Sequence, residues 1–172
     1  MKKILLALSL IGSLYGNNIG TNVTIEGDNG GYVKNDKSWS FNKNDNKVRI
    51  IMYVDPDEQS KGKPFMPTTF ELEKKYKKSD FLIQVILNLE ATWIPDMVIK
   101  KKLVDKQINI PQREFIIDKE AILVNEWNLP DNEYNVMAFD RHNKLIFLKS
   151  GEMTPEDIKN ISNKIDISIK EK

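Results

Sequence analysis

Cysteine is absent from all 172 residues of the chain. The protein therefore forms no disulfide, and it has no thiolate that could act as a nucleophile or a metal ligand. Histidine is nearly absent too, because His142 is the single one. It falls in a predicted hairpin turn rather than beside a nucleophilic serine, which argues against a Ser–His triad. A zinc site would have to rely on carboxylates, so we expect no metal and no other cofactor.

An excess of charge of either sign is also missing: 26 Lys and Arg residues face 25 Asp and Glu residues, a net charge of +1. Nucleic-acid-binding domains carry a basic patch or stripe, so no nucleic-acid partner is expected. Beyond residue 16, no apolar run approaches the roughly 20 residues that a membrane-spanning helix needs. We therefore expect no membrane insertion of the mature chain.

The first 16 residues have the pattern of a secretory signal peptide. Lys2 and Lys3 precede an apolar run over residues 4–14, and the small residue Gly16 follows. The alternative is a buried N-terminal helix. Abundant Lys, Asn and Ile residues are typical of A+T-rich bacterial genomes, so the pattern predicts export to the periplasm with cleavage after Gly16.

The rest of the chain divides into an arm and one domain. Residues 17–46, rich in Asn, Gly, Asp and Ser, predict an N-terminal arm that adds edge strands to the main sheet through the extended pieces 23–25 and 39–41. Residues 47–172 predict the domain. Its apolar runs, typical of buried strands or hairpins, cover residues 48–54, 81–87, 135–139 and 145–148. We interpret residues 114–118 and 122–124 as a further short pair of strands.

Three helices are predicted between and after these strands. The first begins at Pro67 with Thr69, Leu72 and Tyr76 on one face, and the second covers residues 97–107. The third begins after Thr154, and it places the isoleucines at 158, 161, 165 and 169 on one face. The element order predicts an α/β fold: a mixed β-sheet flanked by helices, ending in a β-hairpin and a C-terminal helix.

Several segments resemble the YtfJ-like family of exported, thioredoxin-fold periplasmic proteins. They are residues 47–53 (KVRIIMY), 126–129 (EWNL), 139–146 (FDRHNKLI) and 148–157 (LKSGEMTPED). The resemblance implies a thioredoxin-like domain. However, the stretch after the first core strand, where redox members of the fold carry cysteines, reads Val54-Asp55-Pro56-Asp57-Glu58-Gln59-Ser60 here. Tyr134 stands where the fold has a proline, so the resemblance carries over the fold and no catalytic residue.

The candidate site is the acidic loop that replaces the redox motif. Asp55, Asp57 and Glu58, with Tyr134 opposite them, are predicted to form a protein-binding edge, because a fold without thiols keeps a shallow groove that can receive a peptide. Trp39, Trp93 and Trp127 are interpreted as core or, alternatively, as walls of a recognition groove. The protein is thus expected to be no enzyme but a binding or scaffold module for a periplasmic or envelope protein, free or within an envelope assembly such as a motility or secretion machine. The alternative is a periplasmic enzyme that uses Asp57 or Glu58 as a general base or metal ligand.

Overall fold

The computed structural model describes residues 18–41 and 46–171, and the predicted signal peptide lies outside this part of the chain. Six strands form the main sheet in the order β2-β6-β5-β4-β7-β8. Their bounds are Gly30–Tyr32 (β2), Val48–Val54 (β4), Phe81–Asn88 (β5), Glu114–Asp118 (β6), Tyr134–Phe139 (β7) and Leu145–Ser150 (β8). Strands β4, β5 and β6 run parallel, whereas β2, β7 and β8 pair antiparallel to their neighbours. The sheet is therefore mixed, as the sequence predicts.

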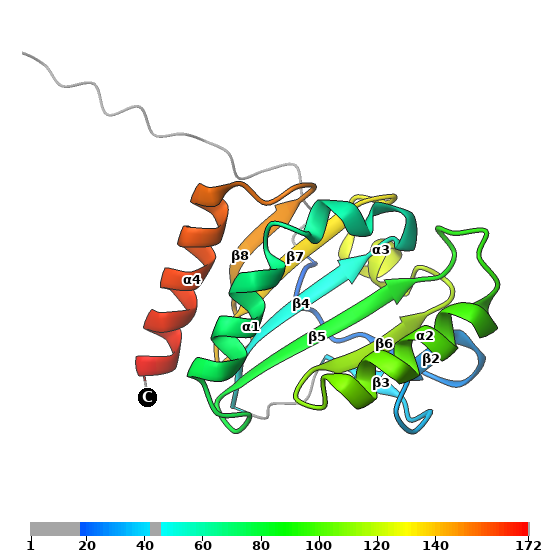
Figure 1. Ribbon diagram of the computed structural model, residues 1–172, viewed down its shortest axis with the longest axis horizontal. Coiled ribbons are helices and arrows are strands. Elements are labelled where there is room, and N and C mark those ends of the chain that lie inside the picture. The colour runs from blue at the N-terminus through cyan, green and yellow to red at the C-terminus, as the bar shows by residue number, and fades with distance from the viewer. Residues whose placement is uncertain (1–17, 42–45, 172) are drawn as a thin grey trace, which may run out of the picture.

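Three helices cover one face of the sheet, called here the front face (Figure 1). They are α1 (Met66–Lys75), α2 (Asp96–Asn109) and α4 (Pro155–Lys170). Every second residue of β4 and β5, such as Met52 and Ile83, points toward these helices. All seven residues of β4 are buried, which confirms a central strand covered on both faces.

The opposite or back face is covered by helix α3 (Ile122–Trp127) and by a small ribbon. Strands β1 (Thr24–Ile25) and β3 (Trp39–Ser40) pair antiparallel to form that ribbon. Large side chains fill the space between them and the sheet, among them Trp39, Phe41 and Trp127. The prediction for the arm was right about its strands but wrong about their partners. The two predicted pieces pair with each other, and the arm reaches the main sheet through β2 instead.

Residues 122–124 form the start of helix α3 rather than the predicted strand. The reason is the carboxylate of Asp118, at the end of β6. It accepts hydrogen bonds from the backbone N–H groups of Ile122 at 3.0 Å and Leu123 at 3.1 Å. A side-chain acceptor for these N–H groups starts a helix, and it outweighs the β preference of a short apolar run.

The other predicted elements match the structure to within about two residues. Helix α4 begins with the predicted cap, in which the Thr154 hydroxyl accepts from Asp157 N–H and the Asp157 carboxylate accepts from Thr154 N–H. Ile161 and Ile165 are fully buried against the sheet. No helix in the described part of the chain is long and apolar enough to cross a membrane. The observed architecture confirms the predicted fold class.

Candidate functional site

The loop after β4 lies at the carboxyl end of the parallel strands, and Asp55 organises it. Residues Pro56–Gly62 form a 3-10 helix, η2, and the Asp55 carboxylate accepts from Asp57 N–H at 2.8 Å to cap it. Asp55 itself is only 3 % exposed. The pKa of the Asp55 carboxyl lies above its ordinary value, mainly because burial raises it. The hydrogen bond from Asp57 N–H lowers this pKa, whereas the negative charges of Asp57, Glu58 and Asp131 raise it. Asp55 is thus part of the loop's framework rather than a surface that a partner could touch.

Asp57 and Glu58 differ from Asp55 because both are accessible. Asp57 is exposed, and one of its carboxylate oxygens lies 3.4 Å from the Thr92 hydroxyl, in the loop between β5 and α2. Glu58 pairs with Lys61 at 2.8 Å, and the same ammonium pairs with Glu133 at 2.8 Å. These contacts join the loops that follow β4 and β5 to the turn that precedes β7, so three separate segments build one edge.

Tyr134 belongs to the same region, but its side chain is buried. Asp55 N–H donates to Glu133 C=O at 3.2 Å, so the turn before β7 does lie against the acidic loop. The phenol ring, 4 % exposed, passes beneath Gly62. A Cβ at position 62 would sit 2.3 Å from a ring carbon, which is why a glycine is needed there. The Tyr134 side chain points into the molecule and not toward the outer edge.

Trp93 is the tryptophan that the core interpretation does not fit. Trp39 and Trp127 are fully buried, as core tryptophans would be, whereas Trp93 is 86 % exposed. Met97, at the start of α2, is 83 % exposed. Trp93 follows Thr92, the residue that contacts Asp57. The signal available in the sequence is that Trp93 stands next to Ile94-Pro95, between two elements and outside any apolar repeat.

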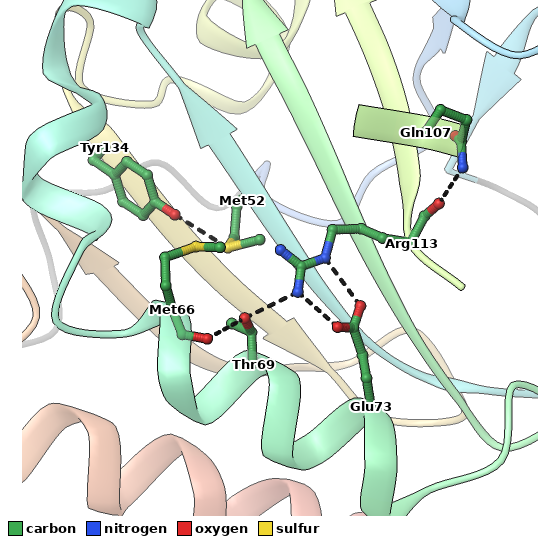
Figure 2. A network of polar contacts seen from close by, with 7 residues as sticks. All are labelled: Met52, Met66, Thr69, Glu73, Gln107, Arg113 and Tyr134. Carbon is green, nitrogen blue, oxygen red and sulfur yellow. Dashed lines mark hydrogen bonds and ion pairs between the residues drawn. The ribbon is translucent and has the colours of Figure 1, made fainter. Parts of the chain in front are cut away.

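A buried ion pair lies deeper, on the front face between α1 and α2 (Figure 2). Arg113, 2 % exposed, donates to both carboxylate oxygens of Glu73 at 2.9 and 2.7 Å and to the Thr69 hydroxyl at 2.9 Å. Its backbone C=O accepts from the Gln107 amide at 2.8 Å. Arg113 therefore connects the two helices. The sequence carries a signal for the position of Arg113. It lies two residues before Phe115, and the alternation of side chains along a strand places both on the front face.

Tyr134 approaches this region from the opposite side. Its hydroxyl donates to the Met52 sulfur at 3.1 Å, and the Met66 sulfur lies beside them (Figure 2). Burial raises the pKa of Tyr134 to about 12, although the nearby Arg113 lowers it. The phenol stays protonated and remains a donor at any physiological pH. Within residues 18–41 and 46–171, no three histidine, aspartate or glutamate side chains converge to hold a metal ion.

Solved structures with a similar fold are thioredoxins and their relatives. The exposed lipoprotein thioredoxin Etrx1 from Streptococcus pneumoniae strain TIGR4 has a TM-score of 0.61 at 13% identity, with 85% of this chain and 98% of that chain covered. A putative protein disulfide isomerase from Bacteroides thetaiotaomicron has a TM-score of 0.62 at 17% identity, with 89% of each chain covered. These likenesses show a thioredoxin-like fold.

Sequence comparison gives the family. The uncharacterized protein YtfJ of Escherichia coli (strain K12) is 21% identical over 127 residues, which cover 73% of this chain and 68% of that protein. Residues 21–168 match the family described as "Bacterial protein of unknown function (YtfJ_HI0045)". The expected resemblance is confirmed, and the chain belongs to the YtfJ family, here as a thioredoxin-like domain without a single cysteine.

Proposed function

We propose that the protein is a non-redox binding module of the bacterial periplasm, which holds a protein partner at the carboxyl edge of its parallel strands. The observation that carries the proposal is Trp93, 86 % exposed beside the acidic loop. Tryptophan is enriched among the residues that dominate binding energy at protein interfaces. Met97, four residues further along the chain, is 83 % exposed and adds a second accessible apolar side chain. We call Asp57, Glu58, Trp93 and Met97 the binding edge.

The charges around the binding edge indicate the chemistry of the partner. Asp57, Glu90 and Asp131 are all exposed at the ends of neighbouring strands. The cations nearby are already paired, Lys61 with Glu58 and Glu133, and Lys119 with Asp96 next to Met97. The edge therefore fits a protein surface that has an apolar pocket for Trp93 and lysines or arginines at its rim. Such charges speed up encounter, whereas the tryptophan prolongs the bound state.

The alternative, an enzyme that uses Asp57 or Glu58, has less support. A general base needs a partly desolvated carboxylate within reach of its substrate. Asp57 is exposed, and Glu58 is held by Lys61. The buried carboxylate of this loop belongs to Asp55, and it is engaged in capping η2. A thiol–disulfide oxidoreductase or thiol peroxidase would need a thiolate of its own, which a chain without cysteine cannot supply.

Site-specific photocrosslinking in the native bacterium tests the proposal. A photoreactive amino acid replaces Trp93 or Met97, and a matched variant carries it at Ile167, an exposed apolar residue of α4. Cells are fractionated before mass spectrometry. We expect one common adduct from positions 93 and 97, in the periplasmic fraction, and none from 167. The double substitution Asp57→Lys with Glu58→Lys should reduce that adduct, and more so at low salt.

Three results would contradict the proposal. The first is an equally strong adduct from position 167. The second is an adduct from positions 93 and 97 whose yield the charge reversal leaves unchanged at every salt concentration. The third is a protein that remains in the cytoplasm with residues 1–16 attached. Melting curves of the variants confirm that they fold, as expected for exposed substitutions, which typically cost within about 0.5 kcal/mol.

A further inference from the structure

A cavity of about 590 Å³ lies on the front face between α1 and α2, and the η2 loop that carries Asp57 and Glu58 also lines it. Its volume is in the range of small-molecule sites, roughly 300–1,000 Å³. The floor is apolar and comes from β4, β5 and β6, with Met52, Val85 and Phe115 among its residues. Met66 from α1 and Leu103 from α2 form the two walls. The front-face core is thus divided: one part packs under α1 and α4, another under α2, and Val85 touches both.

Most of the polar side chains that line the cavity are hydrogen-bond donors, and Gln59 and Ser60, which also line it, can both donate and accept. Lys63, Lys106, Arg113 and Tyr134 line it, and no aspartate or glutamate does. Lys63 and Lys106 are solvent-exposed and stand at the rim, whereas Arg113 and Tyr134 are buried at the floor. A mostly apolar cavity with a few convergent donors is the usual form of a binding site for a small organic molecule.

Two of the buried donors are incompletely used. Glu73 and Thr69 engage Nε and Nη2 of Arg113, while no hydrogen bond within the described residues involves Nη1. In Figure 2, Nη1 points toward the space between Met66 and Met52. The Tyr134 hydroxyl donates into the same space, to the Met52 sulfur at 3.1 Å. A thioether is a weak acceptor, so an oxygen from a ligand would be the better partner.

Lys106 adds a cation without a counter-ion. It takes part in no ion pair between described residues. Desolvation lowers the pKa of its ammonium, and the like charges of Lys102 and Arg113 lower it further. A bound anion would offset the repulsion of the Lys106 ammonium by Lys102 and Arg113. Because Glu73 already neutralises Arg113, the cations left for an anionic head group are Lys63 and Lys106 at the rim.

We propose that the cavity between α1 and α2 binds a small amphipathic carboxylate, with an apolar chain over Val85 and Met66 and its head group among Arg113 Nη1, Lys106 and the Tyr134 hydroxyl. The ligand class follows from apolar walls combined with cationic donors and with no aspartate or glutamate in the lining. The η2 loop contributes Pro56, Gln59 and Ser60 to the cavity, but none of the four binding-edge residues lines it, so variants can test the two proposals separately.

Calorimetric titration of the full mature chain with dodecanoate, below its micellar concentration, tests this inference. We expect saturable binding to one site. Dodecanol keeps the chain but lacks the charge, butyrate keeps the charge but lacks the chain, and dodecyltrimethylammonium reverses the charge. Each should bind at least tenfold more weakly, because dodecanol and dodecyltrimethylammonium lose the charge-assisted hydrogen bonds and butyrate loses the buried chain.

Variants locate the site. Lys106→Met should weaken dodecanoate binding roughly tenfold, whereas Lys101→Met, the same change on the same helix away from the cavity, should leave it unchanged within about twofold. Val85→Phe, which fills the cavity, should abolish binding, and a melting curve verifies that it folds. Equal affinity for dodecanol and dodecanoate would overturn the proposal, and so would the absence of binding by either. Equal weakening by Lys106→Met and Lys101→Met would place any bound anion elsewhere.

Discussion

The two faces of the sheet are packed differently. On the back face, Phe41 contacts the rings of Trp127 and Phe139 with centroids 4.9 and 4.7 Å away. All three rings are at most 1 % exposed, and ring pairs at such distances add stabilisation beyond the area they bury. On the front face, α1 and α2 stand on either side of a cavity. The back face is therefore close-packed, whereas the front face contains a cavity of the size of a small-molecule site.

Asp118 and Arg113 allow a comparison of buried polar groups, although the back face also holds Trp39 Nε1 and Gln84 Oε1, which have no hydrogen-bond partner among the described residues. The back face buries Asp118 completely and uses both its carboxylate oxygens within the fold. The front face buries Arg113 but leaves Nη1 unused, directed at the cavity (Figure 2). Satisfied buried groups fix a structure, whereas an unsatisfied one carries a desolvation cost that a ligand can remove. The following predictions test whether the two faces really differ in this way, beginning with the largest effect.

Replacement of Asp118 should be the most damaging single change. Its carboxylate accepts from Tyr53 OH at 3.0 Å and from the first N–H groups of α3. Asp118→Ala leaves these buried donors unsatisfied, so the free energy of unfolding should fall by about 3 kcal/mol. Urea denaturation followed by circular dichroism measures it.

The matched control is Thr154→Ala, which removes a helix cap from the surface of the front face. It should lower the free energy of unfolding by about 1 kcal/mol. If Asp118→Ala costs no more than Thr154→Ala, the buried back-face network is not the stabilising element that we describe.

Two adjacent residues of β5 allow a direct comparison of packing. Ile86 is fully buried on the back face, while Val85 lines the front-face cavity. Ile86→Phe overfills a close-packed region and should lower the free energy of unfolding by about 1–3 kcal/mol. Val85→Phe places the same side chain into empty space and should change it by less than about 1 kcal/mol. Thermal and urea unfolding of both variants decide the matter, and equal losses would mean that the cavity does not accept a larger side chain.

The sequence was sufficient for the elements that apolar periodicity and capping define. Val48–Val54 is a strand with the predicted bounds, and α4 begins at the predicted cap. Periodicity was not sufficient where a polar side chain just before an apolar run decides the structure. Asp118 turns residues 122–124 into a helix, a contact that a short apolar run does not announce.

The candidate site was harder to predict than the fold. The position of the acidic loop at the carboxyl edge follows from strand order, but burial separates residues that look alike in sequence. Asp55 is buried and Asp57 exposed although they are two residues apart, because Asp55 caps the turn that presents Asp57. Trp93 and Trp127 likewise differ only in their tertiary surroundings. The cavity has no local signature at all, since it results from the spacing of two helices that are joined to different strands.

The smallest expected effect concerns Asp157 on the front face and the stability that the protein loses there as the pH falls. Burial raises the pKa of Asp157, but the Thr154 hydroxyl, Thr154 N–H and Lys149 outweigh this, and the net pKa lies below its ordinary value. A carboxyl whose pKa is lower in the folded state stabilises the protein above its unfolded-state pKa of about 3.9. That contribution is lost as the pH falls through the lower, folded-state pKa.

Asp157→Asn keeps an acceptor for the cap but removes the charge. At pH 7 it should lower the free energy of unfolding by less than about 1 kcal/mol, the usual worth of an acid at a helix N-terminus. The difference from wild type should vanish as the pH falls through the lowered pKa of Asp157, because both side chains are then neutral. Urea denaturation at a series of pH values measures it, with Glu152→Gln, an exposed acid outside the cap, as the control that shows no such convergence. A difference in the free energy of unfolding that persists at low pH would show that Asp157 stabilises the cap through its shape rather than its charge. The surface cap would then depend on hydrogen-bond geometry, as the buried Asp118 network does.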